Sequence, residues 1–472
     1  MNLARLARHG YAALTKDPHP PPCVLGAEDA LSSLRSALPA GFLLGTATAS
    51  HQIEGGLDND WTDWERGAHP GGEPHIKNRT VSGAACDSWN RIDDDITLMR
   101  RLGSNAYRFS VEWSRLEPTE GAWNEEAADR YLAWANTLRA AGIEPVVTLH
   151  HFTLPRWVAT QGGWMNDRTI DLLAAFARRV AKKLGSAVDL WCTINEPNVL
   201  ATMSYVKGVF PPGLGDQRIA TQVLARLLKA HARMTEVIRE ADTTDADGDG
   251  RATRIGIAHH VRIFQPATRS PLDRLVAGFT DRFFNESIAS APFTGRIELE
   301  IPGVIEISEE VPGLVGSFDY MGINYYGRDH VRADLRDPSL SKQYVPADRP
   351  VSDLGWDIYP EGLYQVLKRY GAVGLPVYVT ENGIADRSGS VRPSFLRSHF
   401  EALVRAAREG VDVRGYFHWS LLDNFEWAEG YEPRFGLFRV NFDSPDKRRT
   451  PTPAVETFQE IARGLGLRPE AG

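Results

Sequence analysis

The sequence predicts an α/β protein, a single (β/α)8 TIM barrel with long loops after its strands. Short apolar runs recur from Phe42 onward, and amphipathic helical patterns separate many of them. Several runs lack the polar alternation of a half-exposed strand, as expected for parallel strands that helices cover on both faces. A doubly wound open sheet is disfavoured, because no strand leads into a G-x-G-x-x-G or P-loop sequence.

Eight runs are candidate strands, the number that closes a barrel of this kind. Catalytic groups of such a barrel lie just past the carboxyl ends of its strands. The eight runs are FLLGTAT (42–48), NAYRFSVEW (105–113), PVVTLHHF (145–152), DLWCTINEP (189–197), RIGIAHHVRIF (254–264), DYMGINYY (319–326), PVYVTENG (376–383) and VRGYFHWSLLDN (413–424).

Two helices can be placed together with their buried faces. Residues 169–184 carry Arg and Lys on one side, and Asp167 is the expected N-cap. Residues 222–238 repeat the pattern, and we expect His231 on their apolar face to be a core histidine rather than a ligand. The apolar face of the first helix consists of Leu172, Leu173, Phe176 and Val180.

The chain divides into an extension, residues 1–40, and one catalytic barrel, residues 41–465. The proline-rich run 18–22 prevents regular helix or strand in the extension. The N-terminus lacks the apolar core of a secretory signal, and no run reaches the ~20 apolar residues of a membrane span. We therefore expect a cytoplasmic protein.

Charge and cysteine content exclude some classes of function. The net charge of −8 argues against nucleic acid as a partner, since phosphate binding needs a concentrated basic face. The three cysteines, Cys23, Cys86 and Cys192, have no metal-ligand spacing and are expected to be free thiols in a reducing compartment. The 12 Trp and 14 Tyr offer flat faces for a sugar ring, although a large core uses aromatic residues too.

An acidic loop, residues 242–251, imitates the first half of a calcium-binding loop through Asp245, Asp247 and Asp249. The glutamate required at loop position twelve is replaced by Gly256. We therefore expect a solvated acidic turn rather than a metal site.

Two glutamates stand where a barrel places its catalytic groups. Glu196 closes the fourth run and Glu381 the seventh, and each lies beside an asparagine. An isolated carboxylate after a strand is usually a loop salt bridge, but two on opposite sides of the barrel mouth suit glycoside hydrolysis. In that reaction one carboxyl protonates the leaving oxygen while the other meets the anomeric carbon. The chemistry needs no metal and no organic cofactor.

Over residues 41–460 the sequence resembles glycoside hydrolase family 1, the β-glucosidase family. TINEP (193–197) resembles the family's acid/base motif, and TENG (380–383) its nucleophile motif. The resemblance implies a retaining β-glycosidase on a (β/α)8 barrel. The other matching segments, in the family's order, are ATASHQIEG (47–55), NAYRFSVEWSRLEP (105–118), TLHHFTLPRW (148–157), GINYY (322–326), GWDIYPEGL (355–363) and WSLLDNFEWAEGY (419–431).

The resemblance also assigns roles by position. Glu196 becomes the acid/base, with a raised pKa, and Glu381 the nucleophile, kept ionised by Arg108 and Tyr326 with Asn324 in support. Trp419 offers the sugar a stacking face, and Trp356 lies on the aglycone side. The residues implied to bind the glycone are Gln52, His151, Asn195, Glu426, Trp427 and Phe435.

The sequence departs from the family pattern after the third strand. The usual His-Trp pair is His151-Phe152 here, which changes a wall of the glycone pocket but not its hydrogen-bond donor. The usual tyrosine before that histidine is His150, which we expect to pack under the loop rather than act in catalysis.

Three alternatives stay beside hydrolysis of small β-glycosides or oligosaccharides. A transglycosylase would use the same covalent intermediate. A 6-phospho-β-glycosidase is disfavoured because the carboxylate of Glu426 would repel a phosphate. An inactive sugar-binding scaffold need not keep both Glu196 and Glu381. The motifs suit glucose most and admit galactose and fucose, and they carry no signal for an oligomeric state.

Overall fold

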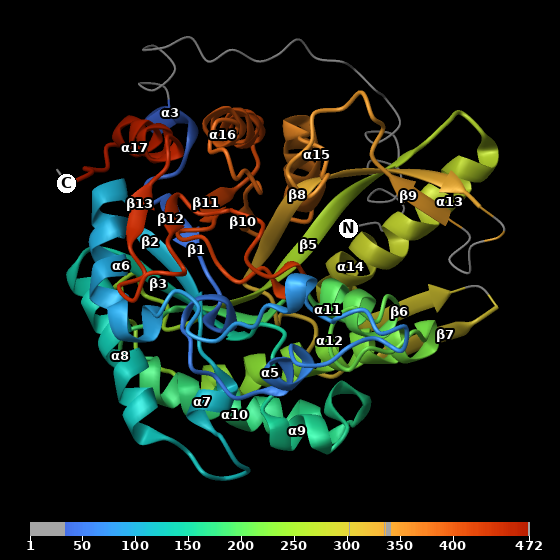
Figure 1. Cartoon of the computed structure of the whole chain (residues 1–472), viewed down its shortest axis with the longest axis horizontal. Coiled ribbons are helices and arrows are strands. Elements are labelled where there is room, and N and C mark those ends of the chain that lie inside the picture. Colours follow the sequence, from blue (N-terminus) through green and yellow to red (C-terminus); the bar gives the residue numbers. More distant parts are fainter. Residues whose placement is uncertain (1–33, 302, 335, 337–340, 471–472) are drawn as a thin grey trace.

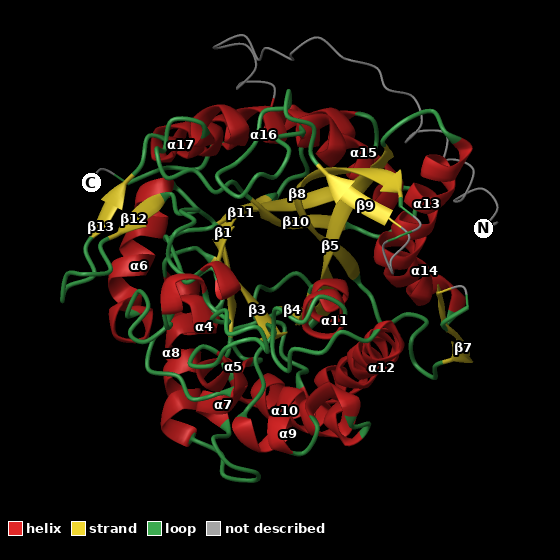
Figure 2. Cartoon of the chain, turned by 45° about the vertical axis from the view of Figure 1, so that its right-hand side comes forward, coloured by secondary structure: helices red, strands yellow, loops and turns green. Residues whose placement is uncertain are grey.

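The computed structural model describes residues 34–301, 303–334, 336 and 341–470. Eight parallel strands form a closed barrel, since β1 pairs with both β11 and β2 and β10 pairs with both β11 and β8. Figure 2 shows the strands in the centre and the helices around them. The predicted fold class is confirmed. The barrel strands are β1 (Leu43–Ala47), β2 (Ala106–Ser110), β3 (Glu144–His150), β4 (Leu190–Asn195), β5 (Arg254–Pro266), β8 (Tyr320–Ala333), β10 (Val377–Asn382) and β11 (Val413–Trp419).

Long helices follow the strands and form the outer layer (Figure 1). Their buried residues pack against the strands, so the hydrophobic core lies mainly between the barrel and this layer. The outer helices are α6 (Ser88–Leu102), α8 (Glu125–Ala140), α10 (Arg168–Leu184), α12 (Gln217–Ala241), α13 (Pro271–Asp281), α14 (Ser287–Thr294), α15 (Pro360–Gly371), α16 (Arg392–Arg408) and α17 (Ala454–Leu465).

The loops after the strands contain short elements of their own. Antiparallel pairs form between β6 (Arg296–Ile301) and β7 (Ile305–Glu310) and between β12 (Phe438–Val440) and β13 (Arg449–Pro451). The short helices are α4 (Ser50–Ile53), α5 (Asp60–Trp64), η1 (Lys77–Arg79), α7 (Trp113–Leu116), α9 (Arg156–Thr160), η2 (Gly163–Met165), α11 (Pro197–Tyr205), η3 (Arg282–Glu286) and η4 (Trp427–Glu429).

The barrel interior has a hydrophobic cluster separate from the outer core. It draws residues from seven strands, so side chains rather than a pore fill the barrel. Tyr320 and Tyr378 meet there with ring centroids 5.0 Å apart. Other strand residues of the cluster are Ala47, Ala106, Val146, Leu190, Tyr326, Phe417 and Trp419.

All eight predicted strands are present, but their ends differ from the predicted limits, and in three of them the difference changes the architecture. β5 and β8 continue past the barrel and pair with each other as far as Pro266 and Val331. There β9 (Ser341–Tyr344) adds to β8 in antiparallel fashion. The last strand ends at Trp419 rather than at residue 424. These limits depend on pairing between distant segments, which the apolar runs alone do not encode.

The predicted helix faces are largely confirmed. Leu173, Phe176 and Val180 of α10 are buried, whereas Leu172 is half-buried. Asp167 precedes this helix but makes no capping hydrogen bond, because its carboxylate binds Arg226 instead. Asp167 thus occupies the predicted N-cap position, but its side chain does not cap the helix.

His231 of α12 is a core histidine, as predicted. Its ring is fully buried and packs against Phe318, with ring centroids 4.1 Å apart. Its Nδ1 lies 2.7 Å from Oγ1 of Thr193 in β4. Burial lowers the pKa of His231 to about 3, so the ring is neutral in the folded chain.

The predicted extension, residues 1–40, stays a prediction, because residues 1–33, and Cys23 with them, lie outside the described residues. α3 (Leu34–Ala37) packs against α16 and α17, with Leu34 and Leu38 buried. Cys86 and Cys192 are buried free thiols. Among the described residues, no helix has the length and apolar character needed to cross a membrane.

Candidate active site

Glu196 follows β4 directly and precedes α11, in a backbone conformation that few non-glycine residues adopt. Its φ is +44°, in the left-handed region. Its N–H donates to the carbonyl oxygen of Ala258 in β5 over 2.7 Å, and Pro197 starts α11 immediately afterwards. Such strain persists where the surrounding structure enforces it, as at many active sites. The Glu196 side chain is thereby fixed at the carboxyl end of the barrel.

Glu381 lies in β10 and is held by one charged and one neutral donor. Nη1 of Arg108 donates to Oε1 over 2.6 Å, and the Tyr326 hydroxyl donates to Oε2 over 2.7 Å. Burial raises the pKa of Glu381 to about 7; Arg108 opposes this rise and the charge of Glu196 adds to it. Both carboxylate oxygens thus have defined partners.

Glu196 has two donors, and both reach the same oxygen. Nδ1 of His260 and Nδ2 of Asn324 each lie 2.9 Å from Oε1. Burial raises the pKa of Glu196, but His260, followed by Asn324 and Arg108, outweighs burial and holds the pKa below its usual value.

The expected tuning of the two carboxyls is therefore wrong in direction. We expected an ionised Glu381 and a raised pKa at Glu196. The depth at which Glu381 is buried explains the first difference, and the contact between His260 and Glu196 explains the second.

Arg108 and two asparagines connect the carboxyls to the glycone side. Nη2 of Arg108 donates to Oδ1 of Asn195 over 2.6 Å, and Nδ2 of Asn324 reaches the same oxygen over 3.1 Å. Nδ2 of Asn195 lies 3.1 Å from Nε2 of His151. Burial, together with the charge of Arg108, lowers the pKa of His151 far below its usual value, so this ring is a neutral hydrogen-bonding group.

Gln52 and Glu426 come from opposite ends of the chain and meet beside this network. Nε2 of Gln52 donates to Oδ1 of Asn424 and to the carbonyl oxygen of Phe425, each over 2.9 Å, and lies 3.4 Å from Oε2 of Glu426. Burial, with the charges of Glu381 and Glu196, raises the pKa of Glu426 to about 8. Oε1 of Gln52 and Nδ1 of His151 are buried without a partner among the described residues, and both are available to a bound hydroxyl group.

Aromatic rings form the walls of the same site. Trp419 and Trp427 both lie nearly parallel to His151, with ring centroids 6.2 and 6.0 Å from it. Phe435 meets Tyr326 at 6.3 Å, and half-buried Trp356 lies 5.4 Å from Tyr326. Every predicted site residue thus contacts another predicted site residue.

His150 is not part of this constellation. Its Nε2 accepts a hydrogen bond from Nε1 of Trp164 over 3.2 Å, and burial lowers its pKa to about 3. It packs beneath the loop after β3, as predicted.

Sequence reasoning missed His260, which lies within the long β5 run. The register pairs Asn324 with both His260 and Glu381, so the three side chains share one level of the barrel. Thr148 and Thr380 were missed as well: Thr148 accepts from Nε of Arg108, and Thr380 donates to Oδ1 of Asn324. Polar residues inside otherwise apolar strands were the signal that could have revealed them.

The acidic loop keeps its carboxylates occupied by the chain itself. Asp245 accepts hydrogen bonds from the N–H groups of Gly248, Asp249 and Gly250. Arg254 forms ion pairs with Asp247 and Asp249. These contacts tie the carboxylates to the loop backbone and to Arg254.

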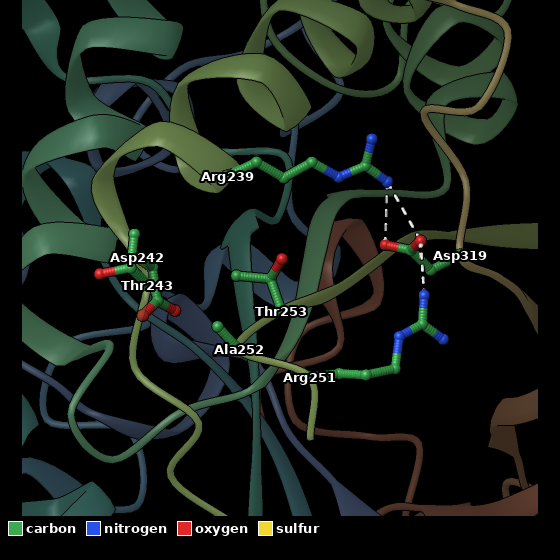
Figure 3. A pocket seen from close by; sticks show the side chains of 7 residues that line it. All are labelled: Arg239, Asp242, Thr243, Arg251, Ala252, Thr253 and Asp319. Carbon is green, nitrogen blue, oxygen red and sulfur yellow. Dashed lines mark hydrogen bonds and ion pairs between the residues drawn. The ribbon is translucent and has the colours of Figure 1, made fainter. Parts of the chain in front are cut away.

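An open pocket of about 450 Å³ lies beside this loop, at the amino ends of β5 and β8 (Figure 3). Arg239 and Arg251 approach from two sides, and both form ion pairs with Asp319, at 3.0 and 3.5 Å. Catalytic groups of barrel enzymes lie at the other end of the strands. None of the predicted site residues lines this pocket.

Comparison with known proteins agrees with the site geometry. The family model described as glycosyl hydrolase family 1 matches residues 34–466. The chain is 36% identical to beta-glucosidase A of Thermotoga maritima, covering 91% of this chain and 98% of that protein. It is 32% identical to a beta-galactosidase of Pyrococcus woesei, covering 91% and 98%. A solved family 1 b-glucosidase from Thermotoga maritima superimposes with a TM-score of 0.81 at 32% identity, covering 91% and 99%. The chain therefore belongs to glycosyl hydrolase family 1 and is a β-glycosidase.

Proposed function

We propose that the chain removes terminal non-reducing β-D-glucosyl residues, with Glu381 as nucleophile and Glu196 as acid/base. The observation that carries this proposal is the asymmetric bonding of the two carboxyls. Both oxygens of Glu381 are held by donors, whereas both donors to Glu196 reach Oε1 and leave Oε2 for the substrate. A fixed carboxylate suits attack on carbon, and a carboxyl with one free oxygen suits proton transfer.

In the first step, a carboxylate oxygen of Glu381 bonds to the anomeric carbon as the glycosidic C–O bond breaks. The bonding electrons pass to the leaving oxygen, which takes the proton from Glu196. This step needs the proton on Glu196 and the negative charge on Glu381. Arg108 and Tyr326 favour that distribution by donating to Glu381, while His260 opposes it.

In the second step, the carboxylate of Glu196 takes a proton from water, and the water oxygen bonds to the anomeric carbon. The bond to Glu381 breaks and its electrons restore the carboxylate. Two displacements at one carbon return the β configuration. Passing the sugar to another hydroxyl group instead of water would give transglycosylation with the same residues.

The glycone is proposed to lie between the polar and aromatic groups around Glu381. Gln52, His151, Asn195 and Glu426 provide donors and acceptors for hydroxyl groups, and Trp419 provides a flat face. Trp427 and Phe435 close the sides. A phosphate would add negative charge to a buried site that already contains Glu196, Glu381 and Glu426, so an unphosphorylated sugar is favoured. Relatives named as a beta-glucosidase, a beta-galactosidase and a bifunctional beta-D-glucosidase/beta-D-fucosidase support glucose as the main glycone, with galactose and fucose as further substrates.

Trp356 is proposed to contact the aglycone, since it lies next to Tyr326 on the outer side of the carboxyls. The guanidinium carbon of Arg262 lies 5.8 Å from its ring centroid, which holds the indole in place. We also propose a cytoplasmic location, supported by the buried free thiols of Cys86 and Cys192.

The test is azide rescue with 2,4-dinitrophenyl β-D-glucoside as substrate. Glu381→Ala should lose activity and regain it with azide, giving the α-glycosyl azide. Glu196→Ala should regain activity with azide through the β-glycosyl azide, because azide replaces water and needs no base. The fluorescence and circular dichroism of both variants should match the wild type. Wild-type rates in either alanine variant would refute the assignment of that residue.

The product of the wild-type reaction tests the remaining alternatives. Release of free glucose in proportion to nitrophenol supports hydrolysis. Nitrophenol release with oligosaccharide products and little free glucose would identify a transglycosylase. No turnover of β-glucosides, β-galactosides or β-fucosides would favour an inactive scaffold.

A further inference from the structure

His260 links the two catalytic carboxyls more closely than any role in packing requires. Its ring lies nearly parallel to Tyr326, with centroids 5.7 Å apart, and Tyr326 donates to Glu381. Its Nδ1 reaches Oε1 of Glu196, and Phe284 meets its edge at 5.8 Å. The side chain of His260 is 8% exposed, so this position is fixed by its neighbours.

The hydrogen bond from His260 makes the two carboxyl oxygens of Glu196 unequal. Oε1 accepts from His260 and Asn324, and no hydrogen bond to Oε2 forms within the described part of the chain. A carboxyl oxygen that already accepts two hydrogen bonds is a poor site for a proton. The proton of the neutral form therefore belongs on Oε2.

We propose that His260 is a positioning residue of Glu196, which keeps Oε1 as the acceptor, leaves Oε2 to exchange the proton, and favours the carboxylate that the second step uses. This inference rests on the proposed role of Glu196 as acid/base. Donors to the carboxylate favour its charged form, so less of Glu196 carries a proton at a given pH. His260 thus favours hydrolysis of the glycosyl-enzyme at some cost to proton donation in the first step.

Several other charged or titratable groups act on Glu196 and Glu381, and His260→Phe leaves all of them in place. Arg108 from β2 favours the carboxylate of Glu196, and Glu381 from β10 and Glu426 after β11 carry charges that couple to the pair. Tyr326 from β8 couples to both catalytic carboxyls. On β5 itself, Arg262 is engaged by Asp329 at 2.8 Å, and His259 contacts Tyr370 rather than Glu196. Only His260 and Asn324 donate directly to Glu196 within the described residues.

Two substitutions separate the donor from the ring. His260→Phe keeps a ring against Tyr326 and Phe284 but removes the donor. His260→Asn keeps a donor near the Nδ1 position but removes the ring. His259→Phe is the matched control on the same strand: His259 is also buried, but its ring nitrogens lie near the carbonyl oxygen of Phe284 and the hydroxyl of Tyr370.

Loss of the donor should raise the pKa of Glu196, which must be protonated for the first step. Because the pKa of Glu196 lies below that of Glu381, the acidic limb of the kcat/KM profile reports Glu196, and in His260→Phe this limb should move to higher pH by about one to two units. With 2,4-dinitrophenyl β-D-glucoside, whose leaving group needs no proton, kcat at acidic pH should fall about tenfold, because more of Glu196 is protonated and cannot take a proton from water. Azide should restore this kcat, and His260→Asn should recover most of it without azide. The pH profile of His259→Phe should equal the wild type.

A purely structural role for His260 predicts a different pattern, which would overturn the inference. In that case His260→Phe keeps the wild-type acidic limb, and azide restores nothing. This failure is distinct from failure of the proposed function, in which Glu196→Ala itself shows no rescue by azide. Circular dichroism of all three histidine variants verifies that each is folded.

Discussion

Arg108 shows how one side chain organises the residues around it. Its three nitrogens reach Glu381, Asn195 and Thr148 at 2.6, 2.6 and 3.1 Å. A fully buried guanidinium is costly unless its donors are satisfied, and here the partners come from three different strands. Glu381, Asn195 and the third strand are therefore held in one geometry.

The second donor to Glu381 can be tested separately. In the wild type, the Tyr326 hydroxyl group donates to Oε2 of Glu381 and lowers the pKa of this carboxyl. Tyr326→Phe removes this donor. Without it the pKa of Glu381 rises, and more of the nucleophile is protonated at a given acidic pH. Because the pKa of Glu381 lies above that of Glu196, the basic limb of the kcat/KM profile should move to higher pH. At neutral pH, kcat/KM should fall about 10- to 100-fold, as for loss of a hydrogen bond to a charged group.

The matched control is Tyr325→Phe, in which the neighbouring tyrosine of β8 loses a hydroxyl group bound to the carbonyl oxygen of Tyr359 at 2.7 Å. This hydrogen bond lies outside the active site, so stability should fall while the pH profile stays as in the wild type. Equal profiles for the Tyr326 and Tyr325 variants would show that the Tyr326 hydroxyl does not tune Glu381.

At the scale of elements, the close approach of two strand ends requires a glycine in the TENG segment. Gly383 follows β10, and a methyl group on its Cα would overlap the carbonyl oxygen of Trp419 at the end of β11. These two strand ends carry Glu381 and the proposed stacking face. The glycine allows these strand ends to approach closely, which fixes the distance between Glu381 and the ring of Trp419.

Gly383→Ala should push the ends of β10 and β11 apart. We expect kcat/KM to fall at least tenfold and the free energy of unfolding to fall by about 1–3 kcal/mol, as for other overpacked sites. Gly71→Ala is the control, since nothing lies within 4 Å of its added methyl group. Initial rates and urea unfolding midpoints measure both effects. Wild-type activity in Gly383→Ala would mean that this approach of the strands is not needed for catalysis.

The same scale shows why the sequence predicted the strands but not every contact. Barrel strands are buried on both faces, so their apolar runs are visible one at a time, and a residue that ends a run can be assigned to the barrel mouth. The contact between His260 and Glu196 depends instead on the register of β5 against β4 and β8. Asp167 likewise binds Arg226 of α12, a competitor that its own helix pattern does not reveal.

At the scale of the whole molecule, buried titratable groups set opposing limits on stability. Burial raises the pKa of Glu54 to about 7 and of Glu426 to about 8, so the folded state disfavours their charged forms. Their contribution to stability is present below the usual carboxyl pKa and is lost as pH rises through 7 to 8. Burial also lowers the pKa of five histidines to about 3, namely His150, His231, His259, His399 and His418.

The histidines act in the other direction. Each stays neutral in the folded chain, while in the unfolded chain each takes up a proton below the ordinary histidine pKa of 6.5. Stability therefore falls as pH decreases below 6.5, and it falls as pH increases through 7 to 8 because of the carboxyls. The free energy of unfolding should have its maximum between about pH 6.5 and 7, which urea unfolding midpoints across pH would measure. A monotonic rise to about pH 9 would contradict this balance.

His418 allows the contribution of a single buried histidine to the pH dependence of stability to be tested. It lies fully buried in β11, and neither ring nitrogen has a hydrogen-bond partner within the described residues. In His418→Leu, the unfolded chain no longer gains this proton at about pH 5, so the variant should lose less stability on acidification. Between about pH 7.5 and about pH 5, the free energy of unfolding of the variant should rise by about 2 kcal/mol relative to that of the wild type. This value follows from about 1.4 kcal/mol for each pH unit below 6.5. The control is Phe417→Leu, a buried change without a titratable group, which should alter the free energy of unfolding equally at both pH values. An equal change at both pH values in His418→Leu would show that the fold does not hold this histidine neutral.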